Sequence, residues 1–273
     1  IRSDSFNITR VWDNADVIPL RHTRIMRIVN WNVERPALSS PKNALRIRHL
    51  LNLQPDIVVL TETSTSIDLG PDYSGFFCSP SPRKPREGES VAAIWVRSDR
   101  FTVVQSIETA DPREAICVEL ESSGQRYIVY GSIIPYHGAK GMDGKSARWQ
   151  EHKDAIRWHS SDWQELRSQF PTHHLVVAGD YNQHRDGIGK YGTIEIRHLL
   201  TTALRESELN CVTEQDFVAT IGLSRRNIDH ICLTNGLVDA VTSVLAWEGT
   251  IDGTRLSDHN GITVELDDAA ITG

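Results

Sequence analysis

The sequence contains neither a Cys-x-x-Cys pair nor an apolar run long enough to cross a bilayer. Its four cysteines stand far apart, so neither a structural zinc module nor a disulfide framework is indicated. A membrane-spanning helix needs about 20 apolar residues, and no segment approaches this length. Cys117 and Cys232 lie in apolar runs, where buried thiols are expected. Unpaired thiols favour a cytoplasmic location, although the sequence begins at Ile1 and leaves open whether a leader peptide was removed.

The chain also lacks an excess of positive charge. Its formal net charge is −7, so no long-range field draws it onto nucleic acid or anionic lipid. This argues against tight non-specific binding of DNA, but it is compatible with a hydrolase that meets phosphates through a metal ion and a few local cations. Short basic stretches occur at residues 81–87 (SPRKPRE) and 224–227 (SRRN). Each of them is predicted to be a solvated loop.

What the 273 residues do contain is a mixture of apolar strands and amphipathic helices. Helical spacing predicts helices at 42–53, 145–169 and 193–205, and the long one has Trp149, Ile156, Trp163 and Phe170 on one buried face. Apolar and β-branched runs predict strands at 25–33, 56–63, 91–97, 101–107, 115–120, 126–134, 174–180, 228–234, 238–247 and 261–266. The four strands between 91 and 134 follow one another at the short spacing of a single antiparallel layer.

This organisation predicts one α/β domain. No repeat and no long linker interrupts the chain, so residues 25–273 are expected to form the domain and residues 1–24 an N-terminal extension. Strands mixed with helices throughout favour a sandwich of two sheets with helices on the outer faces.

Several of the predicted strands end in polar side chains of the same kind: Asn32 with Glu34, Glu62, Asp180 with Asn182, and Asp258 with His259 before the last strand. Loops at a common sheet edge bring such side chains together. Carboxylate and amide oxygens are hard ligands that suit Mg²⁺ or Mn²⁺. Glu62 is the strongest single candidate for a metal ligand, because nothing else explains a carboxylate after an apolar run. The alternative is an acid that caps a turn or faces water.

Five segments together resemble the motifs of the endonuclease/exonuclease/phosphatase superfamily, in order and in rough spacing: VNWNVE (29–34), PDIVVLTET (55–63), VVAGDYN (176–182), NIDHI (227–231) and RLSDHNG (255–261). The resemblance runs from about residue 26 to residue 266. It implies a four-layered α/β/β/α sandwich in which two mixed, largely antiparallel sheets pack face to face with helices outside. It also implies a metal-assisted site that hydrolyses a phosphoester.

The resemblance implies that one group of residues lies around the metal ion: Asn32, Glu62 and Asp258, with Glu34 close by as a further ligand or as a support for one. A divalent cation helps to form a strong nucleophile and to neutralise charge on the phosphorus. These residues carry the oxygen ligands that such a cation prefers.

A second group would carry the proton and phosphate chemistry. Asp180 resembles the base that activates or aligns the attacking water, and Asn182 the amide that bonds the phosphate without adding repulsive charge. His259 resembles the histidine that holds a phosphate oxygen. Asp229 would fix its tautomer and favour its charged form. The alternative for His259 is a turn histidine bonded to the backbone.

The sequence departs from the superfamily pattern in the mid-chain strand. Nucleases of the superfamily commonly carry Tyr or His shortly before the proline there, whereas residues 132–134 are Ser-Ile-Ile ahead of Pro135. Tyr136 and His137 follow the proline and are candidates for substrate contact, with plain surface loop residues as the alternative. Arg148 is a further candidate, although an ordinary helix-surface position is favoured for it.

The predicted function is divalent-metal-dependent hydrolysis of phosphodiester bonds, foremost by a DNA or RNA nuclease using Mg²⁺ or Mn²⁺. An abasic-site enzyme needs basic, wedge-forming loops, and a sphingomyelinase needs a membrane-touching hairpin; neither is visible. A phosphomonoesterase or small-molecule phosphodiesterase stays open, and a positive pocket at 81–87 would favour it. A catalytically silent binding module is the alternative from another class, against which the intact polar set argues. No membrane association and no protein partner are expected.

Overall fold

The computed structural model describes residues 24–80 and 86–271. Residues 1–23 of the predicted extension and residues 81–85 of the basic stretch therefore lie outside the described residues. Two six-stranded sheets form the centre of the molecule. Sheet A runs, from edge to edge, β11 (Val241–Trp247), β14 (Gly261–Asp267), β1 (Ile25–Asn32), β2 (Ile57–Ser64), β4 (Glu89–Arg97) and β3 (Tyr73–Phe77). Sheet B runs β5 (Thr102–Ile107), β6 (Ala115–Ser122), β7 (Gln125–Ile133), β8 (His174–Asp180), β10 (Asp229–Thr234) and β9 (Leu209–Cys211).

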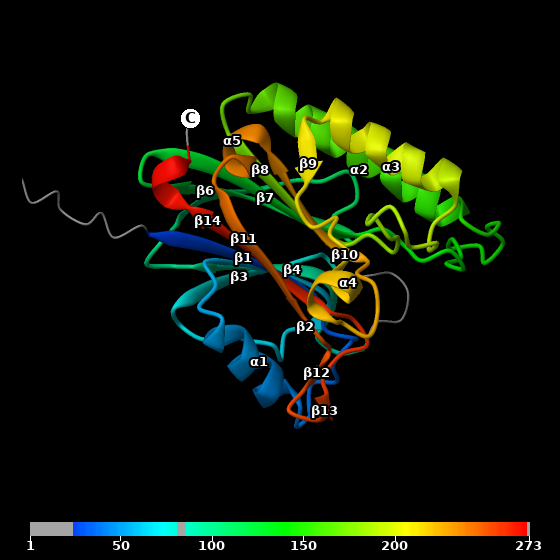
Figure 1. Cartoon of the computed structure of the whole chain (residues 1–273), viewed down its shortest axis with the longest axis horizontal. Coiled ribbons are helices and arrows are strands. Elements are labelled where there is room, and N and C mark those ends of the chain that lie inside the picture. The colour runs from blue at the N-terminus through cyan, green and yellow to red at the C-terminus, as the bar shows by residue number, and fades with distance from the viewer. Residues whose placement is uncertain (1–23, 81–85, 272–273) are drawn as a thin grey trace, which may run out of the picture.

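The helices cover the outer faces of the two sheets. Figure 1 shows α2 (Gln150–Gln169) and α3 (Ile194–Glu206) lying together over sheet B, with α1 (Asn43–Asn52) on the opposite side of the molecule against sheet A. The chain therefore has the predicted α/β/β/α sandwich.

Each sheet contains one parallel pair of strands among antiparallel neighbours. In sheet A the pair is β1 with β2, and in sheet B it is β7 with β8. A parallel pair needs a crossover connection, and α1 and α2 supply the two crossovers. The C-terminal parts of β1, β2 and β8 carry Asn32, Glu62 and Asp180, which places these polar residues at one rim of the sandwich.

Three apolar clusters hold the layers together. Between the sheets, Val59 of β2 packs in one buried cluster with Val129 and Val176 of sheet B. Trp163 and Ile156 of α2 belong to a second cluster outside sheet B, and Leu50 of α1 belongs to a third outside sheet A. Strands buried on both faces read as continuous apolar runs, which is why the core strands were predictable.

The differences from prediction lie in short elements and at ends. The structure adds β3 and β9, α4 (Phe217–Ile221), α5 (Asn235–Val238), the hairpin of β12 (Thr250–Ile251) and β13 (Thr254–Arg255), and the 3₁₀ turn η1 (Asp268–Ala270). The strand predicted from 238 begins only at Val241, because α5 precedes it. The helix predicted from 145 begins at Gln150, because Trp149 before it has a left-handed backbone with φ 69°.

Two further expectations were wrong in detail. The strands between 91 and 134 do not form a single layer, since β4 lies in sheet A and β5, β6 and β7 lie in sheet B. Trp149 caps α2 from outside the helix and is half-buried, whereas Trp163 is fully buried as expected. Cys117 and Cys232 are buried free thiols, as predicted.

Candidate active site

Strained backbone surrounds the polar strand ends. Glu62 has φ 46° although it lies within β2. Its neighbours Thr61 and Thr63 pair with β4, whereas Glu62 itself has no strand partner there. Glu34 and Asn182 are also left-handed, with φ 58° and 49°. Such conformations cost non-glycine residues about 1–3 kcal/mol each and cluster at functional sites.

Asp180, at the end of β8, is almost fully buried, with 1% of its surface exposed. Its Oδ2 accepts hydrogen bonds from Asn32 Nδ2 at 3.1 Å and from Asn182 Nδ2 at 2.9 Å. The Asn182 backbone N–H donates to Oδ1 at 2.9 Å. The preceding residue is necessarily glycine, because a Cβ at Gly179 would lie 1.8 Å from the Ser132 carbonyl oxygen of β7.

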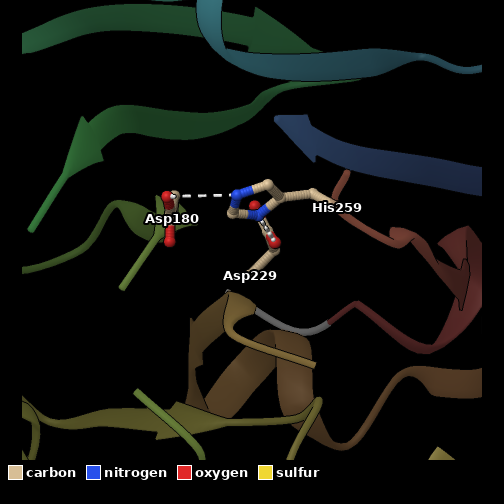
Figure 2. A group of neighbouring side chains, drawn as sticks. All are labelled: Asp180, Asp229 and His259. Atoms are coloured by element: carbon tan, nitrogen blue, oxygen red, sulfur yellow. Dashed lines mark hydrogen bonds and ion pairs between the residues drawn. The ribbon is translucent and has the colours of Figure 1, made fainter. Parts of the chain in front are cut away.

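His259 bridges Asp180 and Asp229. Figure 2 shows the imidazole between the two carboxylates, with Nδ1 2.7 Å from Asp229 Oδ2 and Nε2 4.0 Å from Asp180 Oδ2. The two aspartates are directly opposed in the antiparallel pairing of β8 and β10. Ser257 Oγ accepts from the His259 N–H at 3.0 Å and donates to Asn32 O at 2.6 Å, so the β13–β14 loop is fixed against β1.

Burial and neighbouring charges shift the pKa values of Asp180 and of the His259 imidazole. Burial raises the pKa of Asp180 to about 7; Asp229 and Glu62 add to this and His259 opposes it. Burial alone would lower the pKa of His259, but Asp229 and Asp180 outweigh it and raise that pKa to about 10. At neutral pH the ring is therefore an imidazolium.

The residues predicted to lie around the metal ion differ in how exposed they are and in which side chains they contact. Asp258 has 45% of its side chain exposed, with Oδ1 3.9 Å from His259 Nε2. Glu62 has 28% of its side chain exposed and pairs with Arg35 Nε at 3.2 Å, while its charge acts on Asp180. Glu34 instead contacts Arg255 at 2.5 Å. Among the described residues, Asp180, Asp229 and His259 bring ligand atoms within 4.8 Å of one another, a group that could hold an ion.

A cleft of about 360 Å³ opens beside these residues and has Glu62, Asn182 and Tyr136 among its lining side chains. Tyr136 is 53% exposed, which agrees both with substrate contact and with a plain surface loop residue. His137 lies behind it with Nδ1 3.4 Å from the hydroxyl of Tyr191. Arg148 is exposed and precedes α2, so the helix-surface alternative does not describe it.

Sequence reasoning missed Tyr191, which connects two predicted residues. Its hydroxyl donates to Asn182 Oδ1 at 3.4 Å and lies by His137. Burial raises the pKa of Tyr191, against the lowering effects of a bond to His137 and the charge of Arg148. No motif marked this residue, since it lies in a loop between β8 and α3.

The 224–227 stretch is a loop with Ser224 and Arg225 exposed, as predicted, but Asn227 is buried and the segment makes specific contacts. Arg225 donates to the Asp258 carbonyl and the Asn227 amide donates to the Asp229 carbonyl. Arg226 forms ion pairs with the side chains of Asp186 and Asp216. This segment supports both the His259 loop and the start of β10. The NIDHI motif (227–231) is the sequence feature that could have indicated this support, because it places Asn227 two residues before Asp229.

The sandwich, together with a buried Asp–His–Asp group at the strand ends, defines a phosphoesterase of a known kind. The chain belongs to the Endonuclease/Exonuclease/phosphatase family, whose profile matches residues 29–259. The family consists of metal-dependent phosphoesterases. No curated protein matches the chain significantly.

Solved structures share the fold at low sequence identity. The endonuclease domain of TRAS1, a telomere-specific non-LTR retrotransposon, is 15% identical with a TM-score of 0.63, covering 89% of this chain and 98% of that one. The human Nocturnin catalytic domain is 21% identical with a TM-score of 0.62, covering 88% and 93%. An AP endonuclease from Archaeoglobus fulgidus is 17% identical with a TM-score of 0.61, covering 89% and 99%. In the described part of the chain, no helix is both long and apolar enough for a membrane span.

Proposed function

We propose that this protein is a divalent-metal-dependent phosphodiesterase in which Asp180 activates water and His259 receives the phosphate. The observation that carries the proposal is the placement of Asp180 and Asp229 on either side of one imidazole, at 4.0 and 2.7 Å. A structural histidine such as His159 is bonded by neutral groups, the Tyr130 hydroxyl and the Ile133 carbonyl, whereas the His259 ring faces two carboxylates beside an open cleft.

Asp180 is suited to be the general base. A base works best when its pKa lies near the working pH, and burial raises the pKa of Asp180 to about 7. The amides of Asn32 and Asn182 hold its Oδ2 in place. A water molecule held against this carboxylate would lose its proton to it while attacking phosphorus.

His259 and Asn182 are suited to the phosphate. Asp229 keeps the ring oriented and charged, so Nε2–H can donate to an anionic oxygen. Both N–H groups of the Asn182 amide are already used, one by the Ile134 carbonyl at 3.0 Å and one by Asp180. A phosphate oxygen must therefore compete with one of these acceptors for the Asn182 amide.

The residues around the site fit a divalent cation. The carboxylate and amide oxygens there are hard ligands. We assign the ion to Asn32, Glu62 and Asp258, with Glu34 as a further candidate. Binding to His259 instead would require the ring to lose a proton that Asp229 retains strongly. When bound, the ion supplies Lewis-acid stabilisation of charge on the phosphoryl oxygens and a more acidic water.

DNA or RNA is the first substrate class that we propose, since similar structures are named as endonucleases. A small phosphodiester is the second candidate, and the composition of the cleft favours it. Among the described residues, the cleft lining contains the side chains of six acids and two arginines, together with Tyr136, Met142 and Trp158. An acidic lining of this kind repels a polyanion such as DNA, and it accepts a small phosphodiester that carries an apolar or cationic group.

The test is an activity screen on plasmid DNA, an RNA oligonucleotide, a chromogenic phosphodiester and the corresponding monoester. Each is incubated with Mg²⁺, Mn²⁺ or a chelator. Nicking or degradation identifies a nuclease, whereas turnover of only the small diester or monoester identifies a small-molecule phosphoesterase. Asp180→Asn serves as the inactive variant, and Asp99→Asn, whose side chain is 73% exposed at the surface, is the matched control. No turnover with any substrate and metal would contradict the proposal and favour a silent binding module.

A further inference from the structure

Two cysteines face each other on adjacent strands of sheet B, away from the groups used above. Cys211 ends the edge strand β9 and is half-buried, while Cys232 lies in β10 and is fully buried. They are direct partners in the antiparallel register of β9 and β10. All four cysteines of the chain are free thiols in this structure.

The type of strand pairing brings these two thiols close. The Val212 N–H donates to the Ile231 carbonyl at 3.1 Å. Because this bond joins the residue after Cys211 to the residue before Cys232, the two cysteines form a non-hydrogen-bonded pair. Such pairs have Cα atoms about 4.5 Å apart, and disulfides bridge separations of about 4.4–6.8 Å. Each thiol lies close enough to the other to shift its pKa.

Polar groups surround Cys211 on the same sheet face. Thr213 Oγ1 lies 3.6 Å from its Sγ and 3.1 Å from His230 Nδ1. His230 Nε2 lies 3.1 Å from the Gln183 carbonyl, so Nε2 must carry a proton and donate it there. When Nδ1 is protonated as well, the Thr213 hydroxyl accepts from the ring and donates to Cys211 Sγ, a relay that stabilises a thiolate. Tyr181 OH donates to Cys232 Sγ at 3.6 Å.

The two thiols consequently differ in reactivity. Burial favours the neutral Cys211 thiol, but the bond from Cys232 and the charges of His230 and Arg185 outweigh it and lower the pKa of Cys211. Burial raises the pKa of the Cys232 thiol. It also raises the pKa of Cys78 to about 12, and no cationic partner offsets it there. Attack on an oxidant requires a thiolate, so Cys211 is the thiol equipped for it.

We propose that Cys211 and Cys232 form a disulfide when the protein meets a peroxide. The Cys211 thiolate attacks one peroxide oxygen, the O–O bond breaks, and the released hydroxide takes a proton to leave as water. Cys232 then loses its proton and attacks Sγ of the Cys211 sulfenic acid; the expelled hydroxide takes that proton as a second water. Two thiols are oxidised and one hydrogen peroxide is reduced to two waters.

The disulfide would close the segment that supports the active site. Residues 211–232 include Arg225 and Asn227, which hold the Asp258 and Asp229 carbonyls. Asp229 lies only three residues before Cys232. The bridge would join both ends of this segment, so the oxidised protein should melt at a higher temperature than the reduced protein.

The experiment exposes the reduced full-length protein to hydrogen peroxide, blocks the remaining thiols during denaturation, and maps non-reduced peptides by mass spectrometry. We expect one linked peptide pair containing Cys211 and Cys232, lighter by two hydrogen atoms, with Cys78 and Cys117 blocked. In Cys232→Ser the sulfenic acid on Cys211 should persist and be trapped by a 1,3-diketone, whereas Cys78→Ala should behave like the wild type. Recovery of Cys211 and Cys232 as blocked thiols, or their pairing with other cysteines, overturns the proposal. The peptide map of the oxidised wild-type protein tests the proposal even if one of the variants does not fold.

Discussion

The two parallel strand pairs end in different chemistry. In sheet A, β1 ends in Asn32, and β2 carries Glu62 two residues before its end. In sheet B, β8 ends in the side chain of Asp180, whereas the end of β7 contributes a backbone group. The Ile134 carbonyl, which directly follows β7, accepts a hydrogen bond from the Asn182 side-chain amide at 3.0 Å. The sequence position where family nucleases commonly carry Tyr or His is thus occupied by an apolar segment that contributes a carbonyl.

Two buried histidines of α2 hold that apolar segment. His152 Nδ1 lies 2.6 Å from the Pro135 carbonyl and His159 Nε2 lies 3.2 Å from the Ile133 carbonyl. They are seven residues apart and so share one helix face. The comparison teaches that the sheet B side holds Asp180, the proposed base, among buried hydrogen bonds, while on the sheet A side Glu62, a proposed metal ligand, keeps 28% of its side chain exposed.

The largest expected effect comes from neutralising the base on the sheet B side. Asp180→Asn should lower phosphoester hydrolysis by at least about 10³-fold, because the amide cannot take a proton from water. The fold should persist, since the change removes a buried charge and keeps the shape. Steady-state kinetics and a melting curve measure the two effects. Near-normal activity in a folded Asp180→Asn protein would refute the assigned role.

Asp229→Asn should have the next largest effect, about 10²-fold in rate. The pH profile is the sharper readout. Asp229 helps to raise the pKa of His259 to about 10, so the wild type should keep its imidazolium well above neutral pH. In the variant that pKa falls, and activity should begin to decline at a lower pH on the alkaline side. If activity declines at the same alkaline pH in Asp229→Asn and in the wild type, the charge on His259 is not needed for catalysis.

The α2 histidines predict a loss of stability in acid. Burial lowers the pKa of His152 to about 4 and that of His159 to about 3, against about 6.5 in the unfolded chain. Between these values the unfolded state binds more protons, so stability should fall as pH drops below about 6.5. Each histidine contributes a slope of at most about 1.4 kcal/mol per pH unit. Urea unfolding of His159→Gln should show a shallower slope, whereas the exposed His198→Gln should not. Equal slopes in all three proteins would contradict this reading.

The smallest expected effect concerns Tyr191. Its bond to Asn182 is long, at 3.4 Å, so Tyr191→Phe should reduce activity only about twofold to fivefold. Tyr73→Phe is the matched control, because its hydroxyl bonds the Pro55 carbonyl away from the site. A larger loss in Tyr191→Phe would mean that the hydroxyl contacts substrate.

Much of this arrangement was predictable because it rests on continuous patterns. Core strands are apolar on both faces, and the polar residues that end them stand out for that reason. Contacts between side chains that are far apart in the sequence were not predictable. Nothing in the VNWNVE segment indicates that Glu34 contacts Arg255, and nothing in SRRN indicates that Arg225 holds the Asp258 carbonyl. Short elements such as β9 and α5 are stabilised by packing and not by their own periodicity.

The central claim is that the ion binds on the sheet A side, at Glu62 and Asp258, while Asp180 and Asp229 on the sheet B side serve the base and the histidine. The most direct test of this claim is Mn²⁺ binding, measured by electron paramagnetic resonance of the free ion. Glu62→Gln and Asp258→Asn should each weaken binding at least about tenfold, because each removes a charged oxygen ligand. Asp229→Asn should bind Mn²⁺ nearly as the wild type does. Normal binding in Glu62→Gln, together with loss in Asp229→Asn, would place the ion among Asp180, Asp229 and His259 and contradict the account.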